Sequence, residues 1–486
     1  MITAVPPARP PHAPAPHAGP GAPARAAVAL RRPAMRHWWA DAVGLVVWAT
    51  FLVVVALWVS NGGPTDLAAG GGGALTSAGR LLGLLASDLM LWQVLAMARI
   101  PWVERAFGQD RIARWHRWLG FSSFWLMVTH VVLVTLGYAS AAGTGPLAEL
   151  WSLVTTGPGI LLATAGAALI VMLTVTSIRA ARRRTRYESW HLLHLYAYLG
   201  VGLALPHQLW TGGDFVGTPW AAAFWWTLWG LAAAAVLAFR VGAPIALSLR
   251  HGLVVTGVEP VAPGAVSIHV NGRRLEELRV AGGQFFVWRF LTGPGWTRGH
   301  PFSLSAAPST DGLRVTAATR GDDGPRLAAL RPGTRVLLEG PHGRLTGHAR
   351  TRPGLALAGS GLGVAPLVAL LQDAVRSGEL VRPATLVRRV RTPGPQPFDA
   401  DLGALVDAGW VRVVDLTGGR ATAGTSWLPS DTGHVDGAEA LRLLVPDLDD
   451  CDLFVCGTSP WVKAVAADAR RAGVPASALH VEHFSW

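Results

Sequence analysis

Four histidines stand in two apolar stretches of the sequence at nearly equal spacings. His116 and His130 are fourteen positions apart in HRWLGFSSFWLMVTH, and His194 and His207 are thirteen apart in HLYAYLGVGLALPH. Fourteen residues of an ideal helix rise roughly 21 Å and return to nearly the same face. Two such helices side by side would place one imidazole pair at each of two depths, which is what bis-histidine ligation of a haem iron requires. We therefore predict that these four side chains hold two b-type haems.

The position of His207 departs from an ideal helix. Thirteen steps of about 100° leave it well off the face that His194 occupies. Pro206 removes one hydrogen bond of the helix and can kink it, so we expect this proline to redirect His207. The alternative is that the histidines form hydrogen bonds between membrane helices, the role that we expect for Asp88 and Gln93.

The segments that must position these histidines are long and apolar. The chain of 486 residues is 51% hydrophobic and only 15% charged, and its hydrophobic residues are concentrated between positions 38 and 240. A helix needs about 20 apolar residues to cross ~30 Å of hydrocarbon. Arg80, at the outer end of the second span, is a candidate partner for a haem propionate. We predict six membrane spans in a lipid bilayer: 43–60, 81–98, 118–138, 159–177, 192–210, which is shorter and carries His194 and His207, and 221–239.

The formal net charge of +12 does not indicate a nucleic-acid partner, because the arginines alternate between loops. Loops 61–79, 139–157 and 208–219 contain no lysine or arginine. By the positive-inside rule, we predict a multi-pass protein of the cell membrane with both termini in the cytoplasm. The arginine-rich loops precede the third and fifth spans and contain Arg99, Arg105, Arg111, Arg114 and Arg117, and Arg179, Arg182, Arg183, Arg184 and Arg186.

The two ends of the chain differ in character. Residues 1–37 are rich in proline, alanine and arginine, which predicts a disordered cytoplasmic tail rather than a signal peptide. Cys451 and Cys456 lie in the cytoplasmic half, so no disulfide framework is expected.

The region 250–348 contains short β-rich runs separated by turns, the pattern of a small antiparallel barrel. GHPFSLSAAP, at 299–308, offers an aromatic ring at Phe302, hydroxyls at Ser303 and Ser305, and a basic group at His300. Together these groups suit a planar ligand that accepts hydrogen bonds and carries phosphate.

The stretch GLALAGSGLGVAPLVALLQDAV, at 354–375, predicts a strand, a glycine-rich turn and a helix. Gly359, Gly361 and Gly363 would let the backbone approach a pyrophosphate, which is favoured at a helix N-terminus. Further strand and helix patterns follow, and they predict a parallel sheet with crossing helices.

In this combination of motifs the chain, from about residue 40 to its end, resembles the ferric reductase / NADPH oxidase superfamily, of the bacterial single-chain flavocytochrome b kind. The resemblance rests on the two histidine pairs, HPFS, GSGLGVAP and the terminal EHFSW. It implies a multi-domain fold. A six-helix α transmembrane haem bundle (38–245) precedes an antiparallel β-barrel FAD domain (250–348) and an α/β Rossmann-like NAD(P)H-binding domain (352–486) of ferredoxin-NADP reductase type.

The resemblance also implies roles for single residues. Phe302 would lie against the isoalloxazine ring, and Phe484 would stack on the flavin where the nicotinamide must enter, with Trp486 as the second candidate. Cys456 would lie beside the nicotinamide, and we assign it and Phe484 to catalysis. The residues expected to bind FAD are His300, Pro301, Phe302, Ser303, Ser305 and Gly321. Those expected to bind the nicotinamide dinucleotide are Gly359, Gly361, Gly363, Pro366, Gly457 and Arg391.

Three positions depart from the superfamily pattern. Ala365 stands where a threonine is frequent, the second flavin-phosphate motif reads RGDDGPRL with backbone groups around Gly321 in place of a hydroxyl, and CGTSP is one residue longer than usual. A basic cluster formed by Arg388, Arg389, Arg391 and Arg420 favours NADPH over NADH, since it can bind a 2′-phosphate.

The order of the modules predicts an electron path. NAD(P)H delivers two electrons as a hydride and a haem iron accepts one, so flavin must stand between them. We expect electrons to pass from cytoplasmic NAD(P)H through FAD and two haems to an outer acceptor, either dioxygen, giving superoxide, or a ferric chelate. One alternative is a quinone reductase or electron shuttle to a membrane partner, and another is a haem-binding transporter or sensor. No obligate protein partner is implied.

Overall fold

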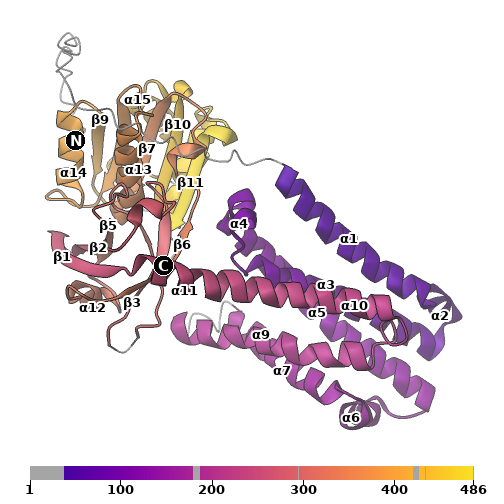
Figure 1. Cartoon of the computed structure of the whole chain (residues 1–486). Helices are drawn as coiled ribbons and strands as arrows, with labels where there is room; N and C mark the ends of the chain where they lie inside the picture. Colours follow the sequence, from indigo (N-terminus) through magenta and orange to yellow (C-terminus); the bar gives the residue numbers. More distant parts are fainter. Residues whose placement is uncertain (1–37, 179–186, 294, 420–425, 433, 485–486) are drawn as a thin grey trace.

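The structure of the chain is a computed structural model that describes residues 38–178, 187–293, 295–419, 426–432 and 434–484. Figure 1 shows a half made of long helices joined to a half that contains the β-sheets. The predicted tail at 1–37, the arginines at 179–186, Arg420 and Trp486 lie outside the described residues.

The helical half is apolar, and most of its helices are long. Five stretches among the described residues are long and apolar enough to cross a membrane: Asp41–Ser60, Gly71–Ala96, Arg111–Ala142, Ile160–Ser177 and Pro219–His251. α9 is 24 residues long but is not one of these five, so the count of six spans stays a prediction. The helices are α1 (Trp38–Ser60), α2 (Gly63–Ala69), α3 (Gly71–Ala96), α4 (Pro101–Phe107), α5 (Gln109–Ala142), α6 (Pro146–Thr156), α7 (Ile160–Ser177), α9 (Tyr187–Trp210), α10 (Pro219–Ala235), the π-helical turn η1 (Val236–Gly242) and α11 (Ala243–His251).

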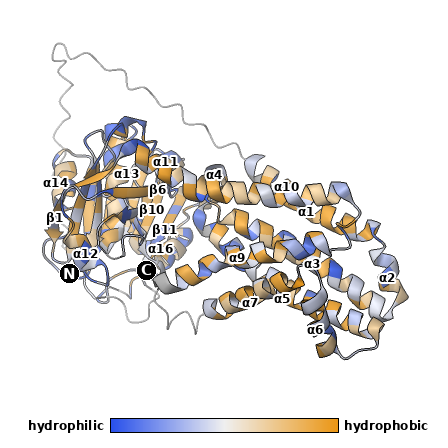
Figure 2. Ribbon diagram, turned by 60° about the horizontal axis from the view of Figure 1, so that its bottom comes forward, coloured by the Kyte–Doolittle hydropathy of each residue, from blue (hydrophilic) through white to orange (hydrophobic). Residues whose placement is uncertain are grey.

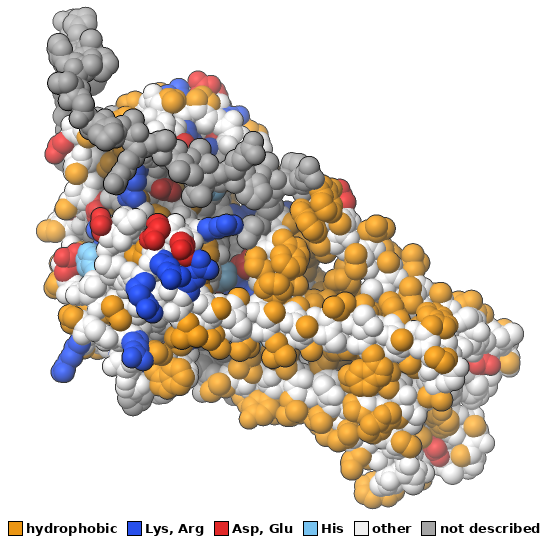
Figure 3. Space-filling model, viewed as in Figure 1, with side chains coloured by type: hydrophobic (Ala, Val, Ile, Leu, Met, Phe, Trp, Pro, Cys, Tyr) orange, Lys and Arg blue, Asp and Glu red, His pale blue; other side chains and the backbone are white. Residues whose placement is uncertain are grey.

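Large hydrophobic side chains are exposed on the surface of this half, as expected for a membrane protein. Figure 2 shows hydrophobic residues running along its helices, and in Figure 3 hydrophobic side chains cover its surface while charged ones gather on the sheet-containing half. Leu45 of α1 is 71% exposed and Leu231 of α10 is 62% exposed. Such exposure of large apolar side chains would be costly in water and is favourable in lipid.

Glycines allow the long helices to pack closely in pairs. A Cβ atom on Gly79 of α3 would lie 2.7 Å from Val134 Cγ2 of α5, and one on Gly166 of α7 would lie 2.5 Å from the Gly200 carbonyl oxygen of α9. Small residues at such contacts bring helix backbones together in a membrane. The four helices that carry or flank the predicted haem ligands are thus held as α3 with α5 and α7 with α9.

The first part of the sheet-containing half, residues 254–342, has two three-stranded antiparallel sheets, and we call it the two-sheet unit. One sheet has the order β1-β2-β5 and the other β4-β3-β6. Isolated bridges from Val254 to Arg335 and from Leu304 to Val315 join them. Phe286 and Trp288 of β3 are fully buried in the core between the sheets. The strands are β1 (Val254–Ala262), β2 (Ala265–Asn271), β3 (Phe285–Phe290), β4 (His300–Ser303), β5 (Leu313–Ala318) and β6 (Val336–His342), and the short helix α12 is Gly324–Ala328.

The last part, residues 354–484, contains one parallel five-stranded sheet in the order β11-β10-β7-β8-β9. β7 and β10 are buried along almost their whole length, as expected for strands covered by helices on both faces. The strands are β7 (Gly354–Ser360), β8 (Ala384–Val390), β9 (Val411–Thr417), β10 (Cys451–Thr458) and β11 (Leu479–Phe484). The helices are α13 (Val364–Arg376), α14 (Asp399–Asp407), α15 (Gly437–Leu444) and α16 (Ser459–Arg471).

The last long helix leads without a break from the helical half to the two-sheet unit. α10, η1 and α11 follow one another, and α11 ends against β6, where the Leu338 backbone N–H donates a hydrogen bond to Ser248 Oγ at 2.9 Å. Figure 1 shows α11 entering the sheet-containing half at this point. The helix therefore extends beyond residue 245, where the sequence analysis placed the end of the membrane domain.

Candidate functional site

The structure brings the four predicted histidines together in two pairs. His116 of α5 and His194 of α9 have ring centroids 6.0 Å apart with an angle of 72° between the rings. His130 of α5 and His207 of α9 lie near enough for their side chains to interact electrostatically. An imidazole nitrogen lies roughly 2 Å from a bound first-row metal, so two rings that share one metal have centroids about 6 Å apart. The spacing of the His116 and His194 rings fits one iron between them.

In three of these four rings, one nitrogen forms a hydrogen bond and the other is left available. His116 Nδ1 donates to the Gln93 carbonyl at 3.3 Å, and His130 Nδ1 donates to the Gly79 carbonyl at 2.8 Å. His207 Nδ1 bonds to the Ala204 carbonyl of its own helix. Because a carbonyl only accepts, each Nδ1 carries the hydrogen and each Nε2 keeps its lone pair. Metal-binding histidines are usually oriented in this way by a backbone carbonyl.

Glycines make room for two of these imidazoles. A Cβ atom on Gly83 of α3 would lie 2.6 Å from His130 Nδ1. One on Gly159, just before α7, would lie 3.0 Å from the His207 backbone nitrogen, and the φ of +77° at this position also favours glycine. α9 continues through Pro206 to Trp210, so the proline does not end the helix that carries His207.

The ligand set suits a haem better than a bare metal ion. Among the described residues, no three or more His, Cys, Asp and Glu side chains form a group that could hold a metal ion. A pair of imidazoles is a complete protein contribution only when the ligand itself supplies the other metal bonds, as a porphyrin does. The geometry of His116 and His194 therefore suits a haem, and His130 and His207 offer the same donor atoms for a second one.

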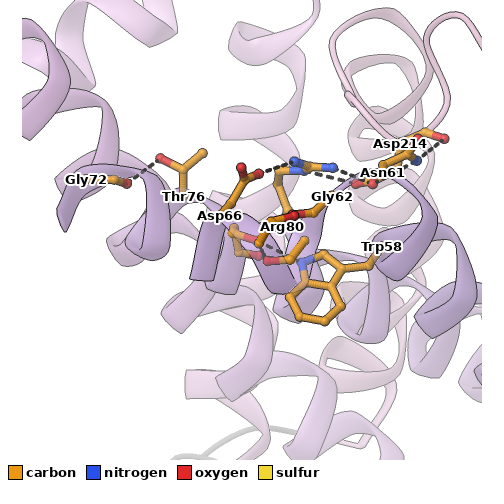
Figure 4. Close-up of polar contacts among 11 residues, drawn as sticks. Trp58, Asn61, Gly62, Asp66, Gly72, Thr76, Arg80 and Asp214 are labelled. Carbon is orange, nitrogen blue, oxygen red and sulfur yellow. Dashed lines mark hydrogen bonds and ion pairs between the residues drawn. The ribbon is translucent and has the colours of Figure 1, made fainter. Parts of the chain in front are cut away.

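Polar residues around the histidines are paired with one another. Ser123 Oγ of α5 donates to Gln93 Oε1 of α3 at 3.3 Å, so Gln93 links two helices as predicted. Arg80 is bound by Asp214, with Nε–Oδ2 and Nη2–Oδ1 distances of 3.2 and 2.5 Å, and lies 3.7 Å from Asp66 (Figure 4). Arg80 thus joins the segments before α3 and α10, and its role as a haem propionate partner stays a prediction.

The HPFS strand, β4, presents two different faces. His300 and Phe302 stack on each other with centroids 5.5 Å apart, and Phe302 packs in the core of the two-sheet unit with Phe286. Strand alternation turns Phe302 toward this core, and its contact with the isoalloxazine ring stays a prediction. Pro301 and Ser303 point to the other face, where Pro301 is exposed.

This outer face of β4 continues across β3 to β6. Phe285 of β3 is paired with both Ser303 of β4 and His342 of β6, so the three side chains form one row on one face. Ser303 Oγ and His342 Nε2 are buried and have no hydrogen-bond partner. Unsatisfied polar atoms in such a position are expected where a ligand completes the hydrogen bonding. We call Ser303, Phe285 and His342 the flavin-face row.

Two other predicted flavin contacts lie elsewhere. Ser305 is fully buried and its hydroxyl accepts from Arg314 Nε at 3.3 Å, while Arg314 also binds Asp401 of α14 at 2.8 Å. Arg314 thus links the two-sheet unit to α14 and holds the Ser305 hydroxyl, while the predicted contact of Ser305 with FAD stays a prediction. Gly321 is exposed in the turn before α12, with a φ of +98° that suits glycine.

The glycine turn after β7 packs against the end of β10. A Cβ atom on Gly363 would lie 2.5 Å from the Cys456 carbonyl oxygen, and one on Gly457 would lie 3.1 Å from Ser360 Cβ. Gly361 is exposed, whereas Gly359 and Pro366 are buried under the turn. The turn therefore meets the carboxyl edge of the parallel sheet, where nucleotides bind in open α/β sheets.

Cys456 has the predicted place in the chain but not a reactive thiol. Its side chain is fully buried in the core beneath the glycine turn. Burial, together with the charge of Glu482, raises the pKa of the Cys456 thiol well above its ordinary value. In this structure the Cys456 thiol is therefore neutral and enclosed, and its predicted place beside the nicotinamide stays a prediction.

Phe484 is the last described residue of β11, paired with Thr458 of β10 and partly buried against the same core. The end of this strand also approaches the flavin-face row. A Cβ atom on Gly343 would lie 3.1 Å from Phe285 Cδ1 and 3.2 Å from Glu482 Oε1. The structure thus brings Glu482 of the C-terminal strand next to the row, and the stacking role of Phe484 stays a prediction.

Only one described arginine of the predicted basic cluster is available to a phosphate. Arg388 is held by Asp415 in two bonds of 2.8 Å and by Asp399 at 2.6 Å. Arg389 donates to backbone carbonyls around Gly418, and burial is the main reason why its pKa is lowered. Arg391, at the end of β8, is exposed.

Phe285 and His342 belong to the site but are not among the residues that the sequence predicts for it. Each stands in an ordinary β-rich run, and only the pairing of β3 with both β4 and β6 places them beside Ser303. The one available signal was the histidine in GPHG, directly after an apolar run.

Comparisons with known proteins agree with the two halves of the structure. Residues 82–205 match the family described as ferric reductase like transmembrane component. The chain is 29% identical over 242 residues to the ferredoxin–NAD(+) reductase component of the alkene monooxygenase system of Xanthobacter autotrophicus, covering 48% of this chain and 70% of that protein. It is 27% identical over 244 residues to the reductase component of propane 2-monooxygenase of Gordonia sp., covering 48% of this chain and 66% of that protein. A solved ferredoxin NADP+ reductase from Neisseria gonorrhoeae with bound FAD and NADP has a TM-score of 0.39 and 18% identity, covering 48% of this chain and 97% of that one.

Proposed function

The chain belongs to the ferric reductase superfamily through its transmembrane domain at residues 82–205, and on that premise we propose that it carries electrons from cytoplasmic NAD(P)H to an acceptor on the outer face. The proposed cofactors are FAD and two b-type haems. The observation that carries the proposal is the pairing of His116 with His194 and of His130 with His207 between α5 and α9. With a haem bound at each, two pairs at two depths would form a path for electrons across the apolar helices.

The reductase half supports the donor side of the proposal. The relatives named above are reductase components, and one is by name a ferredoxin–NAD(+) reductase. When bound, FAD would accept two electrons as a hydride from NAD(P)H and release them singly to the haem irons. Ser303 and His342 offer hydrogen-bonding atoms to the flavin, and the turn at Gly361 offers backbone N–H groups to the dinucleotide.

The histidines determine how the acceptor is reduced. Each iron would receive one Nε2 from α5 and one from α9, which leaves no open position on the metal. The acceptor would therefore be reduced at the haem edge without binding iron. Dioxygen and a ferric chelate both meet this requirement, because each can accept a single electron by outer-sphere transfer.

The proposal is tested with the full chain purified in lipid nanodiscs. Anaerobic NADPH or NADH should convert its visible spectrum to that of reduced b-type haem, and removing FAD should prevent the change. A protein that binds no haem, or whose haem NAD(P)H never reduces, would exclude the function. Superoxide-dismutase-sensitive cytochrome c reduction, compared with ferrous-chelator absorbance, then distinguishes an oxidase from a ferric reductase. Reduction of a quinone analogue alone would instead show an electron shuttle within the membrane.

A further inference from the structure

The two halves of the molecule meet at a compact group of charged side chains. Arg99 and Glu104 come from the turn and α4 between α3 and α5, and Glu339 and His342 come from β6 of the two-sheet unit. We call these four residues the junction network. Their side chains are 16%, 13%, 9% and 6% exposed, respectively, so the network is largely shielded from solvent.

Every link of the junction network is an ion pair or a hydrogen bond. Arg99 Nη1 lies 3.3 Å from Glu104 Oε1, and Arg99 Nε lies 3.7 Å from Glu339 Oε1. His342 Nδ1 lies 3.1 Å from Glu104 Oε1, and Arg289 of β3 completes the group at 3.2 Å from Glu339 Oε2. Two of these links, from Arg99 to Glu339 and from Glu104 to His342, cross from the helical half to the two-sheet unit.

The backbone at Arg99 shows that this position is specified. Arg99 has a φ of +63°, which non-glycine residues adopt rarely and at a cost in free energy. The preceding turn is held by Arg240 of η1, whose Nη1 donates to the Met97 carbonyl at 3.4 Å. A strained arginine that reaches two carboxylates on different halves indicates that its side chain has a positional role.

The charges in the junction network depend on docking of the two halves. Burial alone would raise the pKa of both glutamates. His342 and Arg99 outweigh this effect at Glu104. Arg99, Arg289 and Arg240 outweigh it at Glu339. Both pKa values lie below the ordinary value. Both carboxylates are therefore ionised, and separating the halves would take His342 away from Glu104 and Arg99 away from Glu339.

His342 connects the junction network to the flavin-face row. Its Nδ1 faces Glu104, while its Nε2 is buried without a hydrogen-bond partner and its ring lies 5.4 Å from that of Phe285. Ser303, paired with Phe285 on the opposite side, has the second unsatisfied buried atom. The His342 imidazole therefore contacts Glu104 of α4 and also belongs to the flavin-face row.

We propose that the junction network holds the flavin-bearing unit against the membrane half for electron transfer, with His342 as the positioning residue that binds the flavin through Nε2 and α4 through Glu104. The proposal rests on the proposed function for its electron-transfer part. Glu104 and Arg99 take no part in hydride transfer from NAD(P)H, because they lie on the membrane side of the row.

The test compares Glu104→Gln with the control Glu277→Gln. Glu277 of the two-sheet unit also pairs with an arginine, Arg250 of α11, but both of these side chains are exposed to solvent, by 39% and 56%. In stopped-flow experiments on the full chain, Glu104→Gln should leave flavin reduction by NADPH within about twofold and slow the following haem reduction at least tenfold. Glu277→Gln should change neither rate. Arg99→Lys, which keeps the charge, should slow haem reduction less than Arg99→Gln does.

Two further measurements do not depend on electron transfer. His342→Phe, which keeps an aromatic ring without its nitrogens, should weaken FAD affinity at least tenfold, whereas His342→Gln should recover most of it. Hydrogen exchange of residues 336–342 should accelerate at least tenfold in Glu104→Gln and not in Glu277→Gln. Values within twofold of the control in haem reduction, FAD affinity and exchange would overturn the proposal. The wild-type haem could also fail to be reduced while FAD affinity and hydrogen exchange respond as expected. That result would contradict the proposed function but support the positioning role of the junction network.

Discussion

At the scale of single residues, the histidine spacing was informative because the number of residues between two positions of a helix fixes their separation along its axis and the face that each occupies. His116 and His194 meet at 6.0 Å between ring centroids, and each pair takes one member from α5 and one from α9. The glycines that admit the rings could not be assigned from sequence. Gly83 and Gly44 look alike in an apolar helix, yet only the first lies against an imidazole.

We predict that Gly83→Ala displaces His130 and lowers the haem content of the purified protein from two per chain to about one. The added Cβ would lie 2.6 Å from His130 Nδ1, closer than any real contact. Gly44→Ala is the matched control, since a Cβ there meets nothing within 4 Å. Haem content measured as pyridine haemochrome against protein mass decides the matter. Two haems with an unchanged spectrum in Gly83→Ala would contradict the placement of His130.

A second prediction concerns the choice between NADPH and NADH. Arg391 is the exposed arginine of the described cluster, so Arg391→Gln should lower the ratio of kcat/KM for NADPH over NADH by about tenfold or more, as expected for a charged hydrogen bond of roughly 1.5–3 kcal/mol. Arg391→Lys should keep most of the preference. Arg388→Gln should instead lower the unfolding temperature, because Arg388 is paired with Asp399 and Asp415. An unchanged ratio in Arg391→Gln would remove Arg391 from the nucleotide site.

At the scale of elements, the strand, glycine turn and helix at 354–375 followed from the sequence, because glycine and apolar periodicity act locally. The sequence did not predict which side chains of β4 point into the core, because HPFS fits a strand with either set of alternate residues inside. Pairing with Phe286 of β3 turns Phe302 into the core and places the buried Ser303 on the opposite face of the strand. α9 was also difficult to assign, because its polar histidines lower the apolar signal of a long helix.

The contact between α4 and β6 should depend on pH in a defined direction. The lowered pKa values of Glu104 and Glu339 mean that the docked halves bind fewer protons than separated ones. Docking should therefore be complete above the ordinary glutamate value of 4.5 and weaken as pH falls through the lowered values. The facing groups are Arg99, Arg240, Arg289 and His342.

Exchange-rate-corrected hydrogen exchange of residues 336–342 between pH 8 and pH 3.5 measures this dependence. Protection should be constant down to about pH 5 and fall below it. A midpoint near pH 6.5 would indicate that a histidine, and not the carboxylates, controls docking.

At the scale of the whole molecule, the order of an apolar half and a sheet-containing half could be predicted from composition alone. The place where they meet could not, because Arg99 and Glu104 are far in sequence from Glu339 and His342. The uninterrupted helix from α10 to α11 and the junction network together join the two-sheet unit to the helical half (Figure 1). The flavin-face row thereby lies beside α4, which directly precedes the helix that carries His116.

The most direct test of the account is a redox titration of the haem spectrum in the four single variants His116→Leu, His130→Leu, His194→Leu and His207→Leu. The wild-type protein should titrate in two steps. We predict that His116→Leu and His194→Leu lose one and the same step, and that His130→Leu and His207→Leu lose the other, because each pair shares one iron between α5 and α9. Loss of different steps within a pair, or an unchanged two-step titration in any variant, would contradict the two-haem path.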